Sequence, residues 1–443
     1  MSVNQTAQQR LIILDPGLRE LGGHHPATVL AIADAFTNNE QVSIELLCHQ
    51  DCPTAFTENL NSKVKVTHHF TTDFYQYFYQ LPSYQALQQY CNRLALEYIS
   101  AIKLCLSGIN KKNKKNQKIM FWCHTLNWQH AKALALALDV LKQNHGAEYV
   151  AEIAIIVGLM YSPLDSIKSI KRKMHYELAF RYLAKHDSVK FFAVDYELQK
   201  QYSSLLNKYV DIQPCLLVGE SQKNNHNINQ QINVYHLGVI TADNVKDKSD
   251  NNQVTIILYT GDAKLNKGFS ELPNITGILL ANTSNYQFVI QYSITNDSTI
   301  LSETDIKLKS LASEHSNLTV INQFLEHHEL IELFKAGDAI LFNYDPEVYQ
   351  YQSSGVLWLA AYHQLDILNM TKNWISREAE RLNLTHFYCN SIIKLNKTLV
   401  NIRPKSLKVT KVVNPKEPVG EKNNTYSNKL FLDVSEWFNN IFD

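Results

Sequence analysis

The sequence has little glycine and proline and no long apolar run. Glycine (14) and proline (11) together make up 25 of 443 residues. This fraction is about half of the ~12% that is usual in globular proteins. Each remaining glycine therefore marks a turn or a close approach of the backbone. No run of about 18 apolar residues occurs, so we expect no membrane-spanning helix.

Two further scarcities exclude classes of function. The seven cysteines include no Cys-x-x-Cys pair and are odd in number, so we expect free thiols in a reducing compartment, with no disulfide frame and no metal site. Lys+Arg and Asp+Glu both total 42, whereas a nucleic-acid-binding protein needs a net basic face. The first residues, MSVNQTAQQR, have no apolar core of a signal peptide, so we expect a cytoplasmic protein.

Short apolar runs alternate with longer stretches of helical period, a pattern typical of parallel α/β sheets with helices on both faces. Strands are predicted over 10–15, 42–48, 64–70, 118–123, 151–159 and 189–194, and then over 254–260, 286–294, 318–322, 338–344 and 366–370. Helices are predicted over 26–36, 83–105, 129–141, 167–185 and 196–206, and then over 269–281, 328–335, 353–363 and 375–382.

The alternation breaks once and then restarts, which predicts two domains. We expect an N-terminal domain over 1–215, a polar, Asn-rich linker over 216–252, and a C-terminal domain over 253–399. Residues 400–443 are expected to form an extended tail and a terminal amphipathic helix that docks on its own protein.

In such sheets ligands bind at the carboxyl ends of strands, so the residues after each strand are the first candidates. The first strand is followed by Gly22, Gly23, His24 and His25. Backbone N–H groups of such a turn can hold an anion, and the histidines can contact a hydroxyl or a phosphate. An ordinary surface loop is the alternative, because the turn is neither a dinucleotide fingerprint nor a Walker loop.

His124 follows the strand over 118–123 directly. Its position favours contact with a substrate hydroxyl, and a structural hydrogen bond is the alternative. The first strand of the second domain ends at Gly261, and Lys264 and Lys267 lie on the turn after it. Two ammonium groups at that edge suit a diphosphate, although such lysines are also common on solvated surfaces.

A further candidate is a helix start at Ser353, Ser354 and Gly355, close after a strand. The start can bind phosphate through N–H groups and hydroxyls, or its serines can simply cap the helix. Tyr351 can stack on a base or a sugar. His327-His328-Glu329 is near a metal-binding motif but is interpreted as a helix start.

These features resemble the retaining, GT-B-fold family of glycosyltransferases that use nucleotide-sugar donors. The resemblance rests on the Gly22-Gly23-His24 turn, on the Gly261 to Gly268 segment with its terminal Lys267-Gly268, and on the segment INQFLEHHELIELFKAGDAILFNY. It covers most of residues 10–385, with a patchy motif match. Where the family has an Arg directly after the glycine that matches Gly261, this chain has Asp262. The family's two Glu residues fall on Gln352 and Ala360.

The resemblance implies two Rossmann-like, doubly wound domains that face each other across a cleft. It implies transfer of a sugar from a nucleotide-sugar donor to a glycan or lipid-linked acceptor, with retention, in bacterial-type surface polysaccharide or glycoconjugate synthesis. Lys264, Lys267 and Ser353–Gly355 would offset the charge of the leaving diphosphate, so that no metal and no cofactor besides the nucleotide-sugar co-substrate is needed. His124, together with the Gly22–His25 loop, would face the acceptor in the cleft.

Alternatives remain open at this point. The missing carboxylates favour a non-catalytic GT-B-like binding or scaffold protein, and a sugar-nucleotide epimerase of similar shape is a further possibility. The basic runs Lys111–Lys115 and Lys168–Lys173 are suited to peripheral contact with the inner membrane face, and a solvated face is the alternative.

Overall fold

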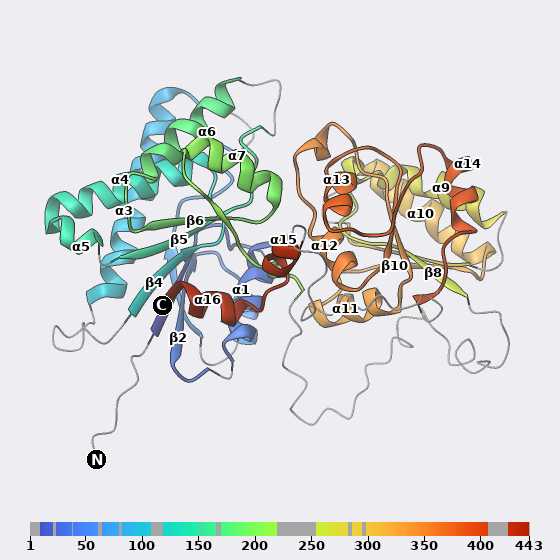
Figure 1. Cartoon of the computed structure of the whole chain (residues 1–443), viewed down its shortest axis with the longest axis horizontal. Coiled ribbons are helices and arrows are strands. Elements are labelled where there is room, and N and C mark those ends of the chain that lie inside the picture. Colours follow the sequence, from blue (N-terminus) through green and yellow to red (C-terminus); the bar gives the residue numbers. More distant parts are fainter. Residues whose placement is uncertain are drawn as a thin grey trace, which may run out of the picture. The chain divides into compact units, whose positions relative to one another are not determined.

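The computed structural model describes most of the chain as two compact units (Figure 1). Unit 1 comprises residues 1–223 and 428–443, and unit 2 comprises residues 224–427. The residues that the structure describes are 9–20, 24–37, 39–60, 64–78, 82–107, 118–151, 153–164, 170–218, 254–281, 286–294, 298–405 and 424–442. Gly22, Gly23, the run Lys111–Lys115 and Lys168 lie outside these ranges.

Unit 1 is built on a seven-stranded sheet of order β3-β2-β1-β4-β5-β6-β7, and every pair of neighbours is parallel. Its strands are β1 (Gln9–Asp15), β2 (Val42–His49), β3 (Val64–Phe70), β4 (Lys118–Cys123), β5 (Ala154–Leu159), β6 (Val189–Ala193) and β7 (Asp211–Ile212). The central strands are buried on both faces, which explains their continuous apolar runs. The predicted parallel sheet is confirmed.

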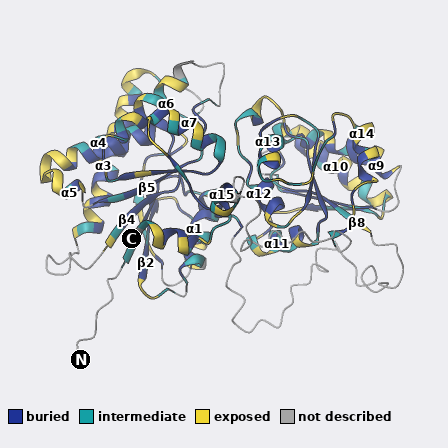
Figure 2. Cartoon of the chain, in the orientation of Figure 1, coloured by how far each residue is buried: buried dark blue, intermediate teal, exposed yellow. Residues whose placement is uncertain are grey.

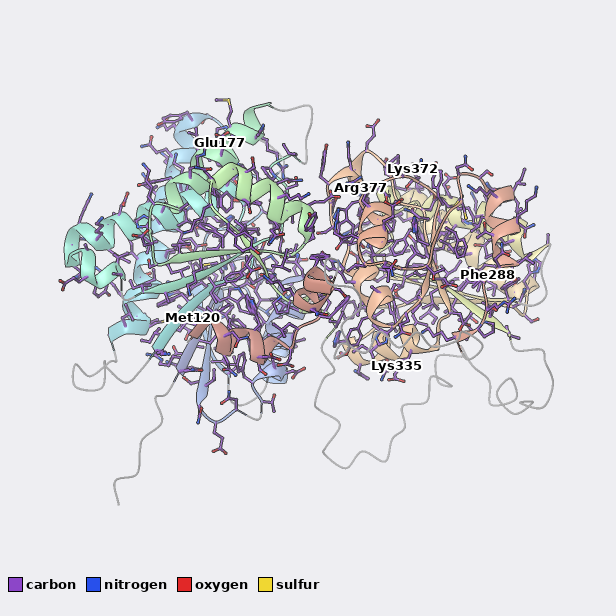
Figure 3. The ribbon with its side chains drawn as sticks, viewed as in Figure 1. Met120, Glu177, Phe288, Lys335, Lys372 and Arg377 are labelled. Carbon is purple, nitrogen blue, oxygen red and sulfur yellow. The ribbon has the colours of Figure 1, made fainter. Side chains whose placement is uncertain are left out.

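Helices cover this sheet, and the strands between them are dark blue, as buried residues, in Figure 2. The helices are α1 (His24–Ala35), α2 (Thr54–Asn59), α3 (Tyr84–Ser107), α4 (Trp128–His145), α5 (Ala147–Ala151), α6 (Ile170–Leu183) and α7 (Tyr196–Leu206). Figure 3 shows Met120 within the strand layer and Glu177 on α6 at the periphery. The sequence analysis did not predict α2, α5 or β7, which are short.

The end of the chain returns to the core of unit 1. Helix α16 (Val434–Phe442) contributes Trp437 and Phe438 to the hydrophobic cluster under β1, β2 and β4. The ring centroid of Phe438 lies 4.8 Å from that of Trp122 and 5.5 Å from that of Phe36. The terminal amphipathic segment therefore docks on its own protein, as expected from its apolar face.

The apolar pattern predicts one terminal helix over 430–442, but α16 begins at Val434 and a separate short helix lies before it. Helix α15 (Asn424–Leu430) precedes α16, and the side chain of Asp433 accepts hydrogen bonds from the backbone N–H groups of Ser435 and Glu436. This capping carboxylate starts a new helix, which the apolar periodicity alone does not reveal. The boundary between the two units falls within α15.

Unit 2 repeats the same winding. Its six-stranded sheet has the order β10-β9-β8-β11-β12-β13, with parallel neighbours throughout. The strands are β8 (Thr255–Tyr259), β9 (Tyr286–Tyr292), β10 (Leu318–Asn322), β11 (Ala339–Phe342), β12 (Asp366–Asn369) and β13 (His386–Tyr388). The side chain of Phe288, labelled in Figure 3, belongs to the buried cluster of this unit.

The helical elements of unit 2 include two that the sequence analysis did not assign, α10 and α14. The elements are η4 (Leu265–Lys267), η5 (Phe269–Glu271), α9 (Leu272–Leu280), α10 (Thr299–Glu314), α11 (His327–Ala336), η6 (Val348–Gln350), α12 (Gly355–Tyr362), α13 (Trp374–Arg381) and α14 (Ile392–Leu399). Helix α10 buries a narrow stripe that includes the polar Thr304, which weakens its apolar periodicity. The predicted helix start at His327 is confirmed, with a capping box between Glu326 and Glu329.

All seven cysteines are free and buried. Among the described residues, every helix is too short or too polar to cross a membrane.

Candidate functional sites

A cluster of buried polar side chains lies where two neighbouring strands of unit 1 end. β1 pairs with β2 on one side and with β4 on the other, so the winding changes direction beside β1. Asp15 is the last residue of β1, and His124 follows the last residue of β4. Ligands bind at such switch points in doubly wound sheets.

Helix α1 places two histidines against this edge. The Nδ1 atom of His25 lies 2.7 Å from the Oδ1 atom of Asp15, and its Nε2 atom lies 2.9 Å from the hydroxyl of Tyr75. The same Asp15 oxygen accepts the backbone N–H of Gly17 at 3.0 Å. Two donors on one oxygen hold the carboxylate in place and orient the His25 ring.

His124 completes the cluster. Its ring centroid lies 5.0 Å from that of His25 and 6.1 Å from that of His24. Its Nε2 atom is 3.7 Å from Oδ2 of Asp15, and neither of its ring nitrogens makes a hydrogen bond within the described part of the chain. One ring nitrogen from each of His24, His25 and His124 lies within 4.8 Å of one from each of the others.

Burial sets the charge state of these groups. It lowers the pKa of His25 to about 3. It also lowers the pKa of His124 to about 3, although the charge of Asp15 opposes the shift. Burial raises the pKa of Asp15, against the influence of His124 and His24. At neutral pH both buried imidazoles are therefore neutral and each carries one lone pair.

Two glycines make the close packing of the histidines possible. A Cβ atom on Gly17 would lie 2.1 Å from Cε1 of His25, and a Cβ atom on Gly158 would lie 2.1 Å from the backbone oxygen of His124. Both distances are far below van der Waals contact. In a chain with so little glycine, two of these residues serve this one cluster.

A second buried histidine network supports the same edge. Asn127 caps α4 through its side chain and lies 2.6 Å from Nδ1 of His130. The other nitrogen of His130 lies 3.2 Å from the hydroxyl of Tyr90, and its ring stacks on Phe74 with centroids 3.9 Å apart. With both nitrogens engaged, His130 has a structural role.

Unit 2 has its own switch point, between β8 and β11. The loop after β8 begins at Gly261 with φ 124° and ends at Gly268 with φ 71°, a region of φ that favours glycine. A Cβ atom on Gly268 would lie 2.2 Å from the backbone oxygen of Asn343, the residue after β11. The two loops at the switch point are thus packed tightly together.

The lysine pair lies on this loop, with different environments. Lys264 is exposed and forms an ion pair of 2.9 Å with Asp262. The Nζ atom of Lys267 lies 2.9 Å from the place where a Cβ of Gly261 would be, and 5.9 Å from the ring centroid of Tyr344. Burial lowers the pKa of Lys267 to about 8, while Asp262 opposes this shift and Lys264 adds to it. A partly desolvated ammonium at a strand end is a strong anion partner.

The helix start at Ser354 lies next to the same groups. Burial raises the pKa of Tyr344, and the hydroxyl of Ser354 offsets part of that rise, so Ser354 lies near the Tyr344 hydroxyl. The Nζ atom of Lys267 lies over the ring of the same tyrosine. Ser354 is buried and makes no side-chain cap hydrogen bond to α12. The side chain of Ser354 therefore uses none of the first N–H groups of α12, although the N–H of Leu357 donates to the backbone oxygen of Ser354 at 3.1 Å.

The structure divides the predicted site residues into two groups. His24, His25 and His124 come together in unit 1; Gly261, Lys264, Lys267 and Ser354 come together in unit 2. Ser353 and Tyr351 are half-buried, and Gly355 is the first residue of α12. Of the positions on which the family's carboxylates fall, Gln352 is exposed and Ala360 is fully buried in α12. A carboxylate at 360 would therefore lie in the core.

Sequence reasoning missed several partners in both groups. Asp15 is a charged residue at the end of β1, directly after the apolar run LIIL, which was an available signal. Tyr75 lies 50 residues from His25 in the chain and carries no local signal. In unit 2, the side-chain oxygen of Gln291 accepts hydrogen bonds from Thr260 at 2.5 Å and from the N–H of Gly261 at 3.3 Å. These two hydrogen bonds hold the loop after β8 against the neighbouring strand β9.

Comparison with known proteins supports the fold. The chain matches no protein-family model and no curated protein sequence. It is similar to the trehalose-6-phosphate phosphatase N-terminal domain of Candida albicans, with a TM-score of 0.58, 10% identity, and coverage of 100% of this chain and 97% of that one. It is also similar to an α,α-trehalose-phosphate synthase (UDP-forming) of Burkholderia vietnamiensis, with a TM-score of 0.57, 10% identity, and coverage of 98% and 99%.

A third similar structure is the lipopolysaccharide outer core galactosyltransferase WaaB, with a TM-score of 0.53, 12% identity, and coverage of 97% of this chain and 98% of that one. At these identities the likeness concerns the fold alone. The chain has the α/β GT-B fold, in agreement with the expectation drawn from the sequence.

Proposed function

We propose that the protein is a glycosyltransferase that takes its sugar from a nucleotide-sugar donor bound to unit 2. The observation that carries this proposal is the position of Lys267. Its ammonium group lies over Gly261 at the switch point of the sheet and beside the Tyr344 ring. The GT-B fold supports the same function, since two similar structures are a trehalose-phosphate synthase and a galactosyltransferase.

The chemistry of donor cleavage fits this arrangement. Negative charge grows on the diphosphate as the bond to the sugar breaks, and fixed positive groups stabilise that transition state. Lys267 supplies a poorly solvated charge and Lys264 a solvated one. The N-terminus of α12, at Ser353, Ser354 and Gly355, supplies N–H groups. With these groups the diphosphate can leave without a metal ion bound to it.

In the family that the sequence resembles, the second of the two Glu residues holds the donor's ribose. Ala360 at that position has no carboxylate and is buried, so the ribose needs a different partner here. Tyr351 is half-buried in the loop between η6 and α12, and we assign it to stacking on the base or the sugar. The acceptor, a glycan or a lipid-linked glycan, is assigned to unit 1, where His24, His25 and His124 mark the carboxyl edge of the sheet. We further propose that the acceptor attacks the front face of the donor sugar, so that its configuration is retained. We assign the protein to surface polysaccharide synthesis, as a cytoplasmic protein in peripheral contact with the inner membrane face.

The test is a calorimetric titration of the full chain with UDP, GDP, ADP and CMP. UDP comes first because the Burkholderia structure is that of a UDP-forming synthase. We expect one nucleotide to bind in the micromolar range. Lys267→Met and Ser354→Ala should weaken it, whereas Lys307→Met should not, because Lys307 is an exposed residue of α10 in the same unit. No binding by any of the four nucleotides would reject the proposal.

A non-catalytic GT-B-like scaffold is the second candidate. The observation that favours it is the pair Gln352 and Ala360 in place of two carboxylates. A scaffold would bind the nucleotide, or a glycan, without releasing a sugar, so turnover of a donor separates the two functions.

A further inference from the structure

We propose that His24, His25 and His124 form a binding site for a divalent transition-metal ion, with zinc as the ion that the ligand chemistry favours. This inference goes beyond the expectation of no metal that the sequence alone produced. It concerns unit 1 only and is independent of the donor site in unit 2.

The first argument is the approach of the ligands. Three imidazoles from two separate segments each bring one ring nitrogen within 4.8 Å of the others. A tetrahedral zinc site has Zn–N bonds of ~2.0–2.1 Å, which places its nitrogens ~3.4 Å apart. The rings therefore need shifts of about an ångström to close on the ion. His24, in the first turn of α1 and only half-buried, is the ring best placed to make this adjustment.

The second argument is the carboxylate behind His25. Metal-binding histidines usually donate their second N–H to a carboxylate, which fixes the tautomer and makes the ligand nitrogen more basic. Asp15 Oδ1 lies 2.7 Å from Nδ1 of His25, so the proton belongs on Nδ1 and the lone pair on Nε2. Among the described residues, that Nε2 atom is hydrogen-bonded only to the hydroxyl of Tyr75, at 2.9 Å, which a metal ion can replace.

The third argument is a set of unsatisfied buried atoms. Oδ2 of Asp15 and both ring nitrogens of His124 are inaccessible to solvent and make no hydrogen bond within the described residues. Both side chains are 1% exposed. Buried polar atoms are normally paired, and each exception needs an explanation. A cation held by His124 and His25, next to the Asp15 carboxylate, would satisfy both residues at once.

The fourth argument is that two glycines leave the space that the histidines occupy. Gly17 and Gly158 both lack the Cβ atom that would collide with His25 or with the backbone of His124. Imidazole ligands suit zinc, copper, nickel and iron, and zinc accepts three histidines with an open fourth position. At a strand end, that position could take a hydroxyl oxygen of a bound sugar.

Zinc binding to the chelator-treated full chain tests the proposal. We expect equilibrium dialysis followed by metal analysis to find roughly one Zn²⁺ per chain. Cobalt(II) added instead should give the visible absorption bands of a tetrahedral site. His24→Gln and His124→Gln should remove most of the affinity, and Asp15→Asn should weaken it by about 10–100-fold. His68→Gln is the matched control, because His68 is an exposed histidine of β3 in the same unit.

The outcomes separate cleanly. If zinc does not bind stoichiometrically, or if His24→Gln binds it as tightly as the unmodified chain, the proposal is wrong and the cluster is a metal-free set of hydrogen-bonding groups. His24→Gln is the decisive variant since His24 is only half-buried, so a folding defect of His124→Gln does not confuse the result. Lys267→Met should keep its zinc, which makes a failure here distinguishable from a failure of the donor site.

Discussion

The imidazole ring of His25 fills the space in which a side chain at Gly17 would have to lie. A Cβ atom built there would be 2.1 Å from Cε1 and 2.4 Å from Nε2 of the ring. The turn after β1 and the first turn of α1 therefore pack against each other at this contact. The Asp15 carboxylate links the same two segments through its hydrogen bonds to Gly17 and His25.

Gly17→Ala should displace His25 from Asp15. We expect a loss of stability of about 1–3 kcal/mol, which is typical of overpacking, together with weakened zinc binding. Urea unfolding and zinc dialysis measure the two effects. Gly277→Ala is the control, because a Cβ atom there meets nothing closer than 3.8 Å and alanine is the better helix residue. Equal stability of the two variants would contradict the contact.

Nucleotide affinity should fall with rising pH because of Lys267. Its pKa is lowered to about 8 by burial, so the ammonium form dominates below that pH and is lost above it. The charged fraction falls from about nine-tenths at pH 7 to about one-tenth at pH 9. The affinity for a nucleoside diphosphate should therefore drop roughly ten-fold. Calorimetry at several pH values measures this step, which Lys267→Met should lack; the same step in that variant would assign it to another group.

Removal of the Phe438 ring should destabilise unit 1. Phe438 is fully buried and packs on Trp122 and Phe36, so Phe438→Ala should cost about 3–5 kcal/mol. Urea unfolding, followed by tryptophan fluorescence, measures the loss. Asn439→Ala, on the exposed side of the same helix, should be nearly neutral. If both variants unfold alike, the helix does not belong to the core.

Glu378 should hold the segment around Tyr426 in unit 2. This carboxylate is fully buried on α13 and accepts hydrogen bonds from Tyr426, from Arg381 at 2.5 Å, and from Trp358 at 3.3 Å. Tyr426→Phe leaves a buried oxygen short of one donor and should cost about 1–3 kcal/mol. Thermal unfolding measures the cost, and limited proteolysis near residue 426 should become faster. Unchanged stability and proteolysis would show that Arg381 and Trp358 suffice.

The sequence predicted the winding of both sheets because strands buried on both faces have apolar runs, such as LIIL directly before Asp15. It placed His24, His25 and His124 at strand ends, but not their meeting point. That meeting depends on β1 and β4 being neighbours, on the His25 ring that packs against Gly17, and on the His124 backbone that packs against Gly158. Nor did it indicate Tyr75 or Gln291, since no local pattern connects them to the groups they contact. The lysine loop was recognisable from its glycines, whereas the lowered pKa of Lys267 depends on its burial in the folded unit.

Release of nucleotide from a nucleotide-sugar is the direct test of the proposed glycosyltransferase activity. The donor is a UDP-sugar, or the corresponding nucleotide-sugar if another nucleotide binds more tightly. Free nucleoside diphosphate is measured with and without a pool of glycan acceptors. We expect release by the unmodified chain, a similar rate for Lys307→Met, and a loss of about 100-fold or more for Lys267→Met. Tight binding of the nucleotide without release under any of these conditions would contradict the proposed activity and identify the protein as a scaffold.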